Sequence, residues 1–409
     1  MKLLFLCAAL VLLFGPRAAL AQVDTTRARY YQPVFPAVTV SSGVAFGSAL
    51  TYTGATQTLL MDIYQPTGDT VRRRPVVIFA HQGGFISGAR TDAYMVRICT
   101  QLAQLGYVTA SIDYRLGFML SFPMTDTVGV ARAAIRGMQD LRAAVRFFRQ
   151  DAAGAKRYRV HSNYIAVGGS SAGAFAALGV GYLDKAAEVP AYVGIAALGG
   201  TEGQSGNPGF SSAVLAVLNL SGATETPNYL EPGNAPLLSV HGTSDTTVPY
   251  LQGRVGSLLP PKYVYGSGRL HPRATQVGIR NTLRPLRGAG HIPFESNAAY
   301  ADTTFRAIRD FLRPSLAQAG TVVTALKPGG PQRGRVVQAY PNPADDVVRL
   351  VLAEALPLPA QAQLLDATGR VVRVLSLGTQ HVTLPRGALK AGIYTLKLPG
   401  QTPVRIEFN

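Results

Sequence analysis

The chain of 409 residues is long enough for one large domain and a second, smaller one. Hydrophobic residues make up 47% and charged residues 15%, a composition that excludes an intrinsically disordered protein. The formal net charge of +17 comes mostly from arginines spread along the whole chain, without a basic run that alternates with aromatic residues. We therefore predict no nucleic-acid partner.

The first 21 residues have the pattern of a secretory signal peptide. Lys2 precedes an apolar run from Leu3 to Phe14, and Ala19-Leu20-Ala21 forms an A-x-A cleavage site. The run is too short to cross a membrane, so we predict export without a transmembrane segment. Removal of the peptide leaves Cys99 as the only cysteine, which predicts a mature protein without an internal disulfide.

Residues 22–37 form a polar leader, and from 38 to 314 apolar strands alternate with helical patterns. Residues 38–45 and 58–64 are predicted to open the sheet as an antiparallel pair. The wholly apolar run 75–80 has the composition of a strand covered on both faces. Further strands are predicted at 107–113, 165–167, 213–220 and 236–241, and helices at 92–105, 129–150, 174–182 and 299–312. This alternation predicts a doubly wound, mainly parallel α/β sheet.

The predicted helix 129–150 has apolar residues three or four positions apart, which places them on one face. They are Met138, Leu141, Val145 and Phe148. Arginines occupy other positions, and we expect them on the solvent side of the helix. They are Arg132, Arg136, Arg142, Arg146 and Arg149.

The sequence changes in character after Pro314. Residues 315–335 are rich in Gly, Pro, Ala and Gln and are predicted to be a linker. From 336 to 409, turn signals separate short strands predicted at 347–352, 362–365, 371–375 and 394–398. This region predicts a small all-β sandwich as a second domain.

The sequence Gly169-x-Ser171-x-Gly173 stands between the predicted strand 165–167 and the helix 174–182. A serine with small neighbours on such a sharp strand-to-helix turn is the arrangement of a nucleophile elbow. The first N–H groups of the following helix are unpaired, so they face any negative charge that develops at the serine. We therefore predict that Ser171 is a nucleophile.

A nucleophilic serine needs a base and a group that orients the base. Asp245 follows the apolar strand 236–241, at the edge where ligand sites of open α/β sheets lie. His291 stands in a glycine-flanked loop before the last helix. The order Ser171, Asp245, His291 is one in which such triads occur. We predict His291 as the base and Asp245 as its orienting acid.

Each assignment has a rival. Ser170 is a second candidate nucleophile, but its frame lacks the second glycine. Glu295 and Asp302 are alternative acids, although both belong to the region of the last helix. Asp245 itself has a simpler interpretation as a residue that closes its own turn, and His291 as an ordinary surface histidine. The expected convergence of three loops on one sheet edge favours the triad.

Acyl transfer also needs fixed hydrogen-bond donors for the oxyanion. We predict the N–H of Ala172, directly after the nucleophile, together with the N–H of Gly83 or Gly84 after strand 75–80. His81, in the same loop, is expected to orient that loop and not to act as a base. No group of His, Cys and carboxylate residues has metal-ligand spacing, so we predict no metal and no other cofactor.

With these residues assembled, the chain from about Val38 to Arg313 resembles the α/β-hydrolase superfamily, in particular its esterase and lipase branch with the carboxylesterases. The resemblance rests on His81-Gln82-Gly83-Gly84, Ile112-Asp113-Tyr114-Arg115-Leu116, Gly169-Ser170-Ser171-Ala172-Gly173, His241-Gly242-Thr243-Ser244-Asp245 and Gly290-His291. Gln82 replaces the first glycine of the family's His-Gly-Gly-Gly loop, which leaves open which amide of the loop donates. The resemblance implies a Ser-His-Asp mechanism without a cofactor, and it supplies no substrate.

Residues 336–409 resemble the C-terminal sorting domain of type IX secretion in Bacteroidetes. The resemblance rests on Tyr340-Pro341-Asn342-Pro343-Ala344, Leu365-Asp366-Ala367-Thr368-Gly369-Arg370 and Leu389-Lys390-Ala391-Gly392-Ile393-Tyr394-Thr395-Leu396. It implies export through the Sec pathway, passage across the outer membrane by the type IX machinery, and a secreted or cell-surface location. A carbohydrate-binding or fibronectin-like sandwich is the alternative.

The sequence thus predicts a secreted serine hydrolase that cleaves carboxylic esters of small molecules or polymers, including polysaccharide acetyl or feruloyl esters. The segment Glu188–Pro232 is predicted to form one wall of its pocket, with Tyr192 and Phe210 as candidate contacts. A secreted peptidase of the prolyl-oligopeptidase kind uses the same triad on the same fold, but it normally needs a large accessory domain. A non-catalytic, glycan-binding surface protein is a further alternative, although it has no use for all three triad residues.

Overall fold

The computed structural model describes residues 28–119, 126–256, 262–318, 337–340, 344–352, 360–366, 370–379, 381–397 and 404–408. The chain separates into two compact units, Met1–Pro328 and Gly329–Asn409, and each is described by itself. The predicted signal peptide, residues 1–21, lies outside the described residues, as do residues 22–27 of the predicted leader and most of the predicted linker. The domain limits therefore stay predictions.

The first unit is built on an eight-stranded sheet with the order β1-β2-β4-β3-β5-β6-β8-β11. The pairs β1/β2 and β2/β4 are antiparallel, and the other pairs are parallel. The strands are β1 (Val38–Leu50), β2 (Thr56–Pro66), β3 (Arg74–Ala80), β4 (Val108–Ile112), β5 (Val160–Ser170), β6 (Val217–Leu220), β8 (Leu237–Gly242) and β11 (Asn281–Leu286). The predicted doubly wound, mainly parallel sheet is confirmed.

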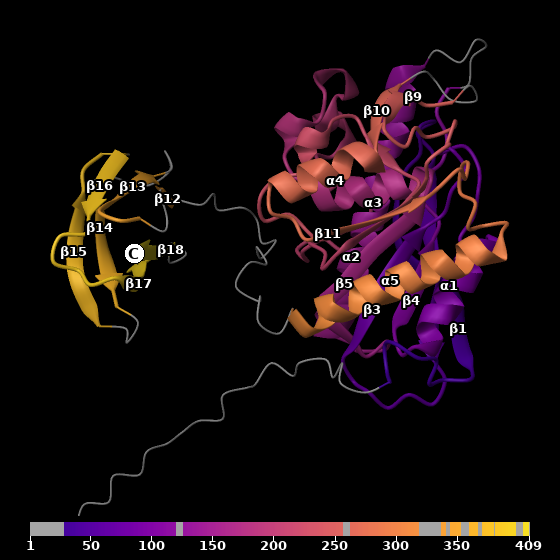
Figure 1. Cartoon of the computed structure of the whole chain (residues 1–409), viewed down its shortest axis with the longest axis horizontal. Helices are drawn as coiled ribbons and strands as arrows, with labels where there is room; N and C mark the ends of the chain where they lie inside the picture. Colours follow the sequence, from indigo (N-terminus) through magenta and orange to yellow (C-terminus); the bar gives the residue numbers. More distant parts are fainter. Residues whose placement is uncertain are drawn as a thin grey trace, which may run out of the picture. The chain divides into compact units, whose positions relative to one another are not determined.

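Helices cover both faces of this sheet (Figure 1). On one face, α1 (Ala93–Gln104) and α5 (Ala298–Gln318) pack over Val77 and Phe79 of β3. On the other face, α2 (Thr127–Ala153) and α3 (Ala172–Tyr182) pack over Val76 and Ile78 of the same strand. Because side chains alternate along a strand, the apolar run 75–80 of β3 supplies both cores.

Smaller elements complete the unit. A second antiparallel sheet has the order β7-β10-β9, and helix α4 packs against the core of the α2 face. Their bounds, with those of the short 3-10 turns, are β7 (Ala223–Thr224), β9 (Gln252–Arg254), β10 (Tyr263–Gly266), α4 (Ser267–Gln276), η1 (Ala186–Glu188), η2 (Ala191–Val193), η3 (Ile195–Leu198) and η4 (Pro227–Tyr229). Neither α4 nor the edge strand β11 was predicted. Polar residues and Pro285 obscure β11, and an edge strand tolerates a proline because it leaves one side unpaired.

The last helix was predicted to end at Leu312, before the break at Pro314, and that limit is wrong. Helix α5 continues through Pro314 to Gln318. Proline removes one helical hydrogen bond. The continuation instead buries Leu316 among the apolar residues that α5 already contributes to the core, including Phe311 and Leu312. Tertiary burial therefore outweighs the local signal.

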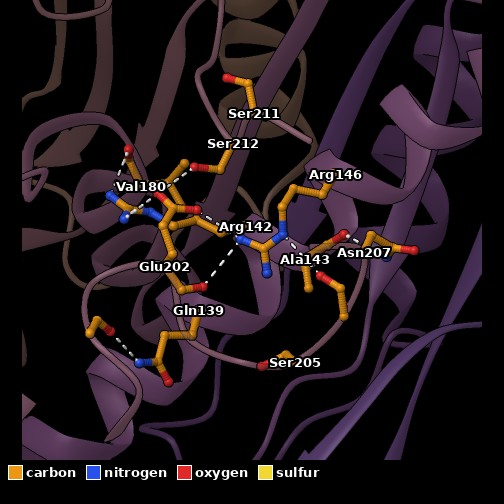
Figure 2. A network of polar contacts seen from close by, with 12 residues as sticks. Gln139, Arg142, Ala143, Arg146, Val180, Glu202, Ser205, Asn207, Ser211 and Ser212 are labelled. Carbon is orange, nitrogen blue, oxygen red and sulfur yellow. Dashed lines mark hydrogen bonds and ion pairs between the residues drawn. The ribbon is translucent and has the colours of Figure 1, made fainter. Parts of the chain in front are cut away.

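The expectation that the α2 arginines face solvent is also wrong for four of the five. Arg132 is exposed, whereas Arg136, Arg142, Arg146 and Arg149 are buried. We call these four residues the arginine cluster. Figure 2 shows two of them, Arg142 and Arg146, among Glu202, Ser205 and Asn207 of the segment that follows α3. Arg142, Arg146 and Arg149 donate to main-chain carbonyl oxygens of that segment, at Leu183, Gly206 and Ser211. Arg136 instead donates to the Gly117 carbonyl oxygen, ahead of α2.

The second unit contains two antiparallel sheets, with the orders β12-β13-β16 and β15-β14-β17-β18. Their strands are β12 (Val337–Tyr340), β13 (Val347–Leu352), β14 (Ala360–Leu365), β15 (Val371–Leu377), β16 (His381–Pro385), β17 (Gly392–Lys397) and β18 (Val404–Phe408). Leu350 and Leu384 from the first sheet share one apolar core with Leu364 and Leu396 from the second. The predicted all-β architecture is confirmed. Within the described residues of both units, no helix is long and apolar enough to cross a membrane.

Candidate active site

Ser171 stands at the turn between β5 and α3. Its backbone has φ 50° and ψ −115°, a conformation that is strained for a residue with a side chain. The two glycines of the motif make the turn possible: a Cβ on Gly169 would lie 2.2 Å from the carbonyl carbon of Gly173, and a Cβ on Gly173 would lie 2.0 Å from the carbonyl oxygen of Ala80. The local sequence therefore presents one serine at the carboxyl edge of the sheet.

The structure brings Ser171, His291 and Asp245 together, although they are 120 and 46 residues apart along the chain. The Ser171 hydroxyl lies 2.8 Å from His291 Nε2, and His291 Nδ1 lies 2.7 Å from Asp245 Oδ2. Asp245 is fully buried, whereas 17% of the His291 side chain is exposed. A neutral His291 that donates from Nδ1 to the carboxylate leaves Nε2 free to accept the Ser171 proton.

The Asp245 carboxylate is held in its ionised form. Burial alone would raise its pKa, but hydrogen bonds from His241 and His291 and from the Val248 N–H outweigh burial and hold the pKa well below its ordinary value. Its Oδ1 accepts the N–H groups of Thr247 and Val248 at 2.9 and 2.8 Å. An acid fixed in this way can orient His291 without taking its proton.

His241 is the site residue to which the sequence pattern assigned no role. It is fully buried, and its Nε2 lies 3.3 Å from Asp245 Oδ2 and 2.9 Å from the carbonyl oxygen of Val248. Its Nδ1 lies 2.9 Å from the Ser267 hydroxyl, which also accepts from Asn219. The spacing of four residues to Asp245 was the available signal. Ser171, His291, Asp245 and His241 together are called the serine cluster below.

The loop after β3 carries the two candidate oxyanion glycines. Gly83 has φ 112°, and a Cβ there would lie 2.1 Å from the carbonyl oxygen of Ser87, so only glycine fits. Gly84 has φ 63° and borders the same cavity as Ser171 and Ala172. Among the described residues, the N–H groups of Gly83, Gly84 and Ala172 make no backbone hydrogen bond of the kind found in turns, loops and helix caps.

Neighbouring side chains brace this loop. His81 is buried and stacks on Tyr114, whose hydroxyl donates to the His81 carbonyl oxygen at 2.8 Å. Burial lowers the pKa of His81, and its Nδ1 lies 2.6 Å from the Gln82 carbonyl oxygen. Gln82, the residue that departs from the family pattern, donates from Nε2 to Asp92 at 3.1 Å. Its side chain thus ties the loop to the start of α1.

The rival residues lie elsewhere. Ser170 is fully buried, and its hydroxyl donates to Glu295 Oε1 at 2.5 Å. Burial raises the pKa of Glu295, against the lowering effect of that hydrogen bond. Asp302 lies on α5 and pairs with Arg306 at 2.9 Å. Glu295 therefore links the His291 loop to the end of β5, and Asp302 pairs along its own helix.

An apolar cavity of about 150 Å³ opens beside Ser171 between α2 and α3, and we call it the α2–α3 cavity. The predicted wall segment, Glu188–Pro232, contributes Val189, Pro190 and Val193 together with residues around β7. Tyr192 and Phe210 are not among the lining residues, so the choice of those two contacts is wrong. Tyr192 instead donates its hydroxyl to Glu225 at 2.8 Å.

Side chains of α2 donate hydrogen bonds to main-chain carbonyl oxygens of the wall segment and so hold it against the helix. Arg132 Nε donates to the Val193 carbonyl oxygen at 2.8 Å, and Gln139 Nε2 donates to Leu198 and Gly200 at 2.8 and 2.7 Å. Figure 2 shows Glu202 between Arg142 and Arg146, with its carboxylate oxygens 3.1 and 2.8 Å from their Nη1 atoms. One wall of the cavity is thus fixed by polar contacts that the sequence pattern did not suggest.

In the part of the chain that the structure describes, no group of three or more His, Cys, Asp or Glu side chains is arranged to hold a metal ion. His161 and His271 are each buried, and burial lowers the pKa of both to about 4. His271 Nδ1 lies 2.7 Å from Asn281 Oδ1, and this contact joins α4 to β11.

Comparisons with known proteins give two family matches. Residues 61–226 match the BD-FAE family, and residues 338–406 match the secretion system C-terminal sorting domain. The first range contains Ser171 and both candidate oxyanion glycines, and it ends before Asp245 and His291. A comparison with curated proteins gives no match.

Similar solved structures include an esterase of the Planctomycetes species Thermogutta terrifontis. Its propionate-bound form is 20% identical, covers 68% of this chain and 94% of its own, and has a TM-score of 0.46. Its butyrate-bound form is 20% identical, covers 70% of this chain and 96% of its own, and has a TM-score of 0.47. The form phosphorylated by paraoxon is 20% identical, covers 70% of this chain and 96% of its own, and has a TM-score of 0.46.

Proposed function

Since the chain carries an esterase-like α/β-hydrolase domain and a type IX secretion sorting domain, we propose that it is a secreted serine esterase. The observation that carries the proposal is the hydrogen-bonded series from Ser171 through His291 to Asp245, in which Ser171 lines an apolar cavity. Nucleophile, base and orienting acid are the parts that acyl transfer requires.

In the proposed mechanism, Ser171 Oγ attacks the ester carbonyl carbon while His291 Nε2 takes the hydroxyl proton. The tetrahedral intermediate then breaks its bond to the alcohol oxygen, and His291 returns the proton to the departing alcohol. Water, deprotonated by His291, attacks the acyl-enzyme and releases the carboxylic acid, which restores Ser171. Asp245 stays ionised throughout and stabilises the protonated His291.

The negative oxygen of the intermediate is proposed to bind the N–H of Ala172 and the N–H of a loop glycine. Gly84 is favoured over Gly83, because Gly84 borders the cavity next to Ser171. Each fixed donor of this kind contributes about 3–4 kcal/mol to the stability of an acyl-transfer intermediate.

The sorting domain implies a secreted or cell-surface location through type IX secretion. We further propose that residues 1–21 direct Sec export before the type IX machinery moves the protein across the outer membrane. A carboxylic ester outside the cell, free or on a polymer, is then the substrate. This placement is tested by locating the full chain in the native host with and without residues 336–409.

The enzymatic proposal is tested with the full chain and p-nitrophenyl acetate. Ser171→Ala is expected to lower kcat/KM by about 10⁴-fold or more, because no other group replaces the nucleophile. Ser170→Ala is the matched control, since it removes the neighbouring hydroxyl and leaves Ser171 in place, and it is expected to stay within about tenfold of wild type.

Other outcomes would redirect the assignment. Cleavage of a dipeptide p-nitroanilide without ester cleavage would favour the peptidase. Glycan binding with no turnover of either substrate would favour a binding protein.

A further inference from the structure

The α2–α3 cavity has a composition that restricts what it can bind. From α2 its wall takes Val130, Ala134 and Met138, each four positions apart, and from α3 it takes Phe175 and Leu178. These residues form facing stripes of two helices, because positions three or four apart lie on one face. These two helix walls are apolar and therefore bind apolar groups.

The two charged residues that reach the cavity neutralise one another. Lys262 Nζ lies 3.2 Å from Glu225 Oε1, and both belong to the β7–β10 side of the cavity. Neither charge needs a ligand of opposite sign. A charged or strongly polar group placed in the cavity would lose its hydration without compensation.

The position of His291 identifies which half of an ester enters. The departing alcohol must lie near His291 Nε2, because that nitrogen gives it a proton. Residues 288–297, all of which the structure describes, contribute nothing to the cavity wall. Gly84 and Ala172, the candidate oxyanion donors, line it together with Ser171. An ester bound with its alcohol toward His291 therefore directs its acyl group into the cavity.

We propose that the α2–α3 cavity is the acyl-binding site, and that it selects esters of an extended, uncharged, apolar acyl group over acetate. This inference rests on the proposed function. Small residues keep the space open, since Ala131 and Ala134 of α2 and Gly179 of α3 are among its lining residues. Met138 forms an adaptable part of its wall: its Sδ would lie only 2.9 Å from a Cβ on Gly179.

The test compares two ester series on the full chain. One series keeps p-nitrophenol and lengthens the acyl group from acetate through butanoate and hexanoate to octanoate. The other keeps the acetyl group and lengthens the alcohol from ethanol to octanol. Its hydrolysis is measured by pH-stat titration of the acid released. We expect kcat/KM to rise about fourfold per methylene in the acyl series until the cavity is full. The alcohol series is expected to vary by less than about threefold.

Two variants tie the profile to the cavity. Ala134→Leu fills it and is expected to lower the octanoate-to-acetate ratio of kcat/KM by about tenfold. Met138→Ala enlarges it and is expected to move the optimum to a longer acyl chain. Ala153→Leu is the control. It makes the same alanine-to-leucine change at the exposed end of α2, outside the cavity, and is expected to leave the profile unchanged.

The outcomes separate this inference from the proposed function. A flat acyl series, or a steep alcohol series, in a protein whose acetate turnover depends on Ser171 would overturn the acyl-binding site and leave the esterase intact. An unchanged profile in both Ala134→Leu and Met138→Ala would overturn it as well. Acetate turnover that survives Ser171→Ala would overturn the esterase mechanism first.

Discussion

The serine cluster and the arginine cluster are both buried polar groups in the first unit, and they are built differently. In the serine cluster each titratable group contacts another one, and Ser171 and His291 remain open to the cavity or to solvent. In the arginine cluster, Arg142 and Arg146 share the single carboxylate of Glu202 and otherwise donate to main-chain carbonyls. The first arrangement can move a proton between Ser171 and His291. The second holds a loop in place.

The largest effect that distinguishes the clusters is expected from Asp245→Asn. An amide still accepts the Thr247 and Val248 N–H groups, but it no longer fixes the tautomer and charge of His291. We expect kcat for p-nitrophenyl acetate to fall about 10⁴-fold, with the thermal midpoint changed by only a few degrees. Steady-state kinetics and circular dichroism measure the two quantities. A loss below tenfold would mean that His291 acts without Asp245.

A smaller catalytic effect is expected from His241→Gln. His241 contacts Asp245 on one side and Ser267 on the other, so its loss lets the carboxylate shift. A misplacement of this kind costs about 10- to 100-fold in kcat/KM. Ser267→Ala is the matched control, because it removes only the outer contact, and we expect a loss below about tenfold. Equal losses in the two variants would place His241 in a purely structural role.

The serine cluster was accessible to sequence analysis because its parts carry local signals. Gly169 and Gly173 frame Ser171 for steric reasons that act within five residues, and Asp245 and His291 each follow a strand at the same sheet edge. Their contacts are long-range, but the order of strands makes them converge. The part missed here was His241, whose two contacts depend on how α4 and the loop after β8 pack.

The arginine cluster was not accessible, because amphipathic periodicity identifies only the more apolar face of a helix. Arg142 and Arg146 fall outside the apolar stripe of α2, and residues outside such a stripe are usually exposed to solvent. Their burial depends on a segment 50–60 residues further along that lies over α2 and offers Glu202 and main-chain carbonyls. Nothing in the pattern around either arginine encodes that cover.

Glu202→Ala tests the structural role of the arginine cluster. Arg142 and Arg146 lose their shared carboxylate and keep the carbonyl oxygens of Leu183 and Gly206. More than half of the Glu202 side chain is exposed, so we expect a moderate loss of about 2 kcal/mol in the free energy of unfolding. The exposed pair of Asp302 with Arg306 is the control, and Asp302→Ala is expected to cost less than about 0.5 kcal/mol.

Denaturant titration measures both variants. Turnover of p-nitrophenyl acetate is expected to stay within about twofold of wild type in Glu202→Ala, since no arginine of the cluster touches the serine cluster. A large loss of acetate turnover in a stably folded variant would show that the two clusters are coupled.

The smallest effect is expected from Glu295→Gln, and its sign depends on pH. Burial raises the pKa of Glu295, so the folded chain keeps a proton that the unfolded chain loses near pH 4.3. The stabilisation from that proton is complete below pH 4.3 and is lost as the pH rises through the raised value. Glutamine does not ionise, and its oxygen still accepts the Ser170 hydroxyl. The thermal midpoint of the variant relative to wild type should therefore increase between pH 4 and pH 8, by no more than about 3 °C. A difference that is constant over this range would show that Glu295 is ionised in the folded protein as readily as in the unfolded one.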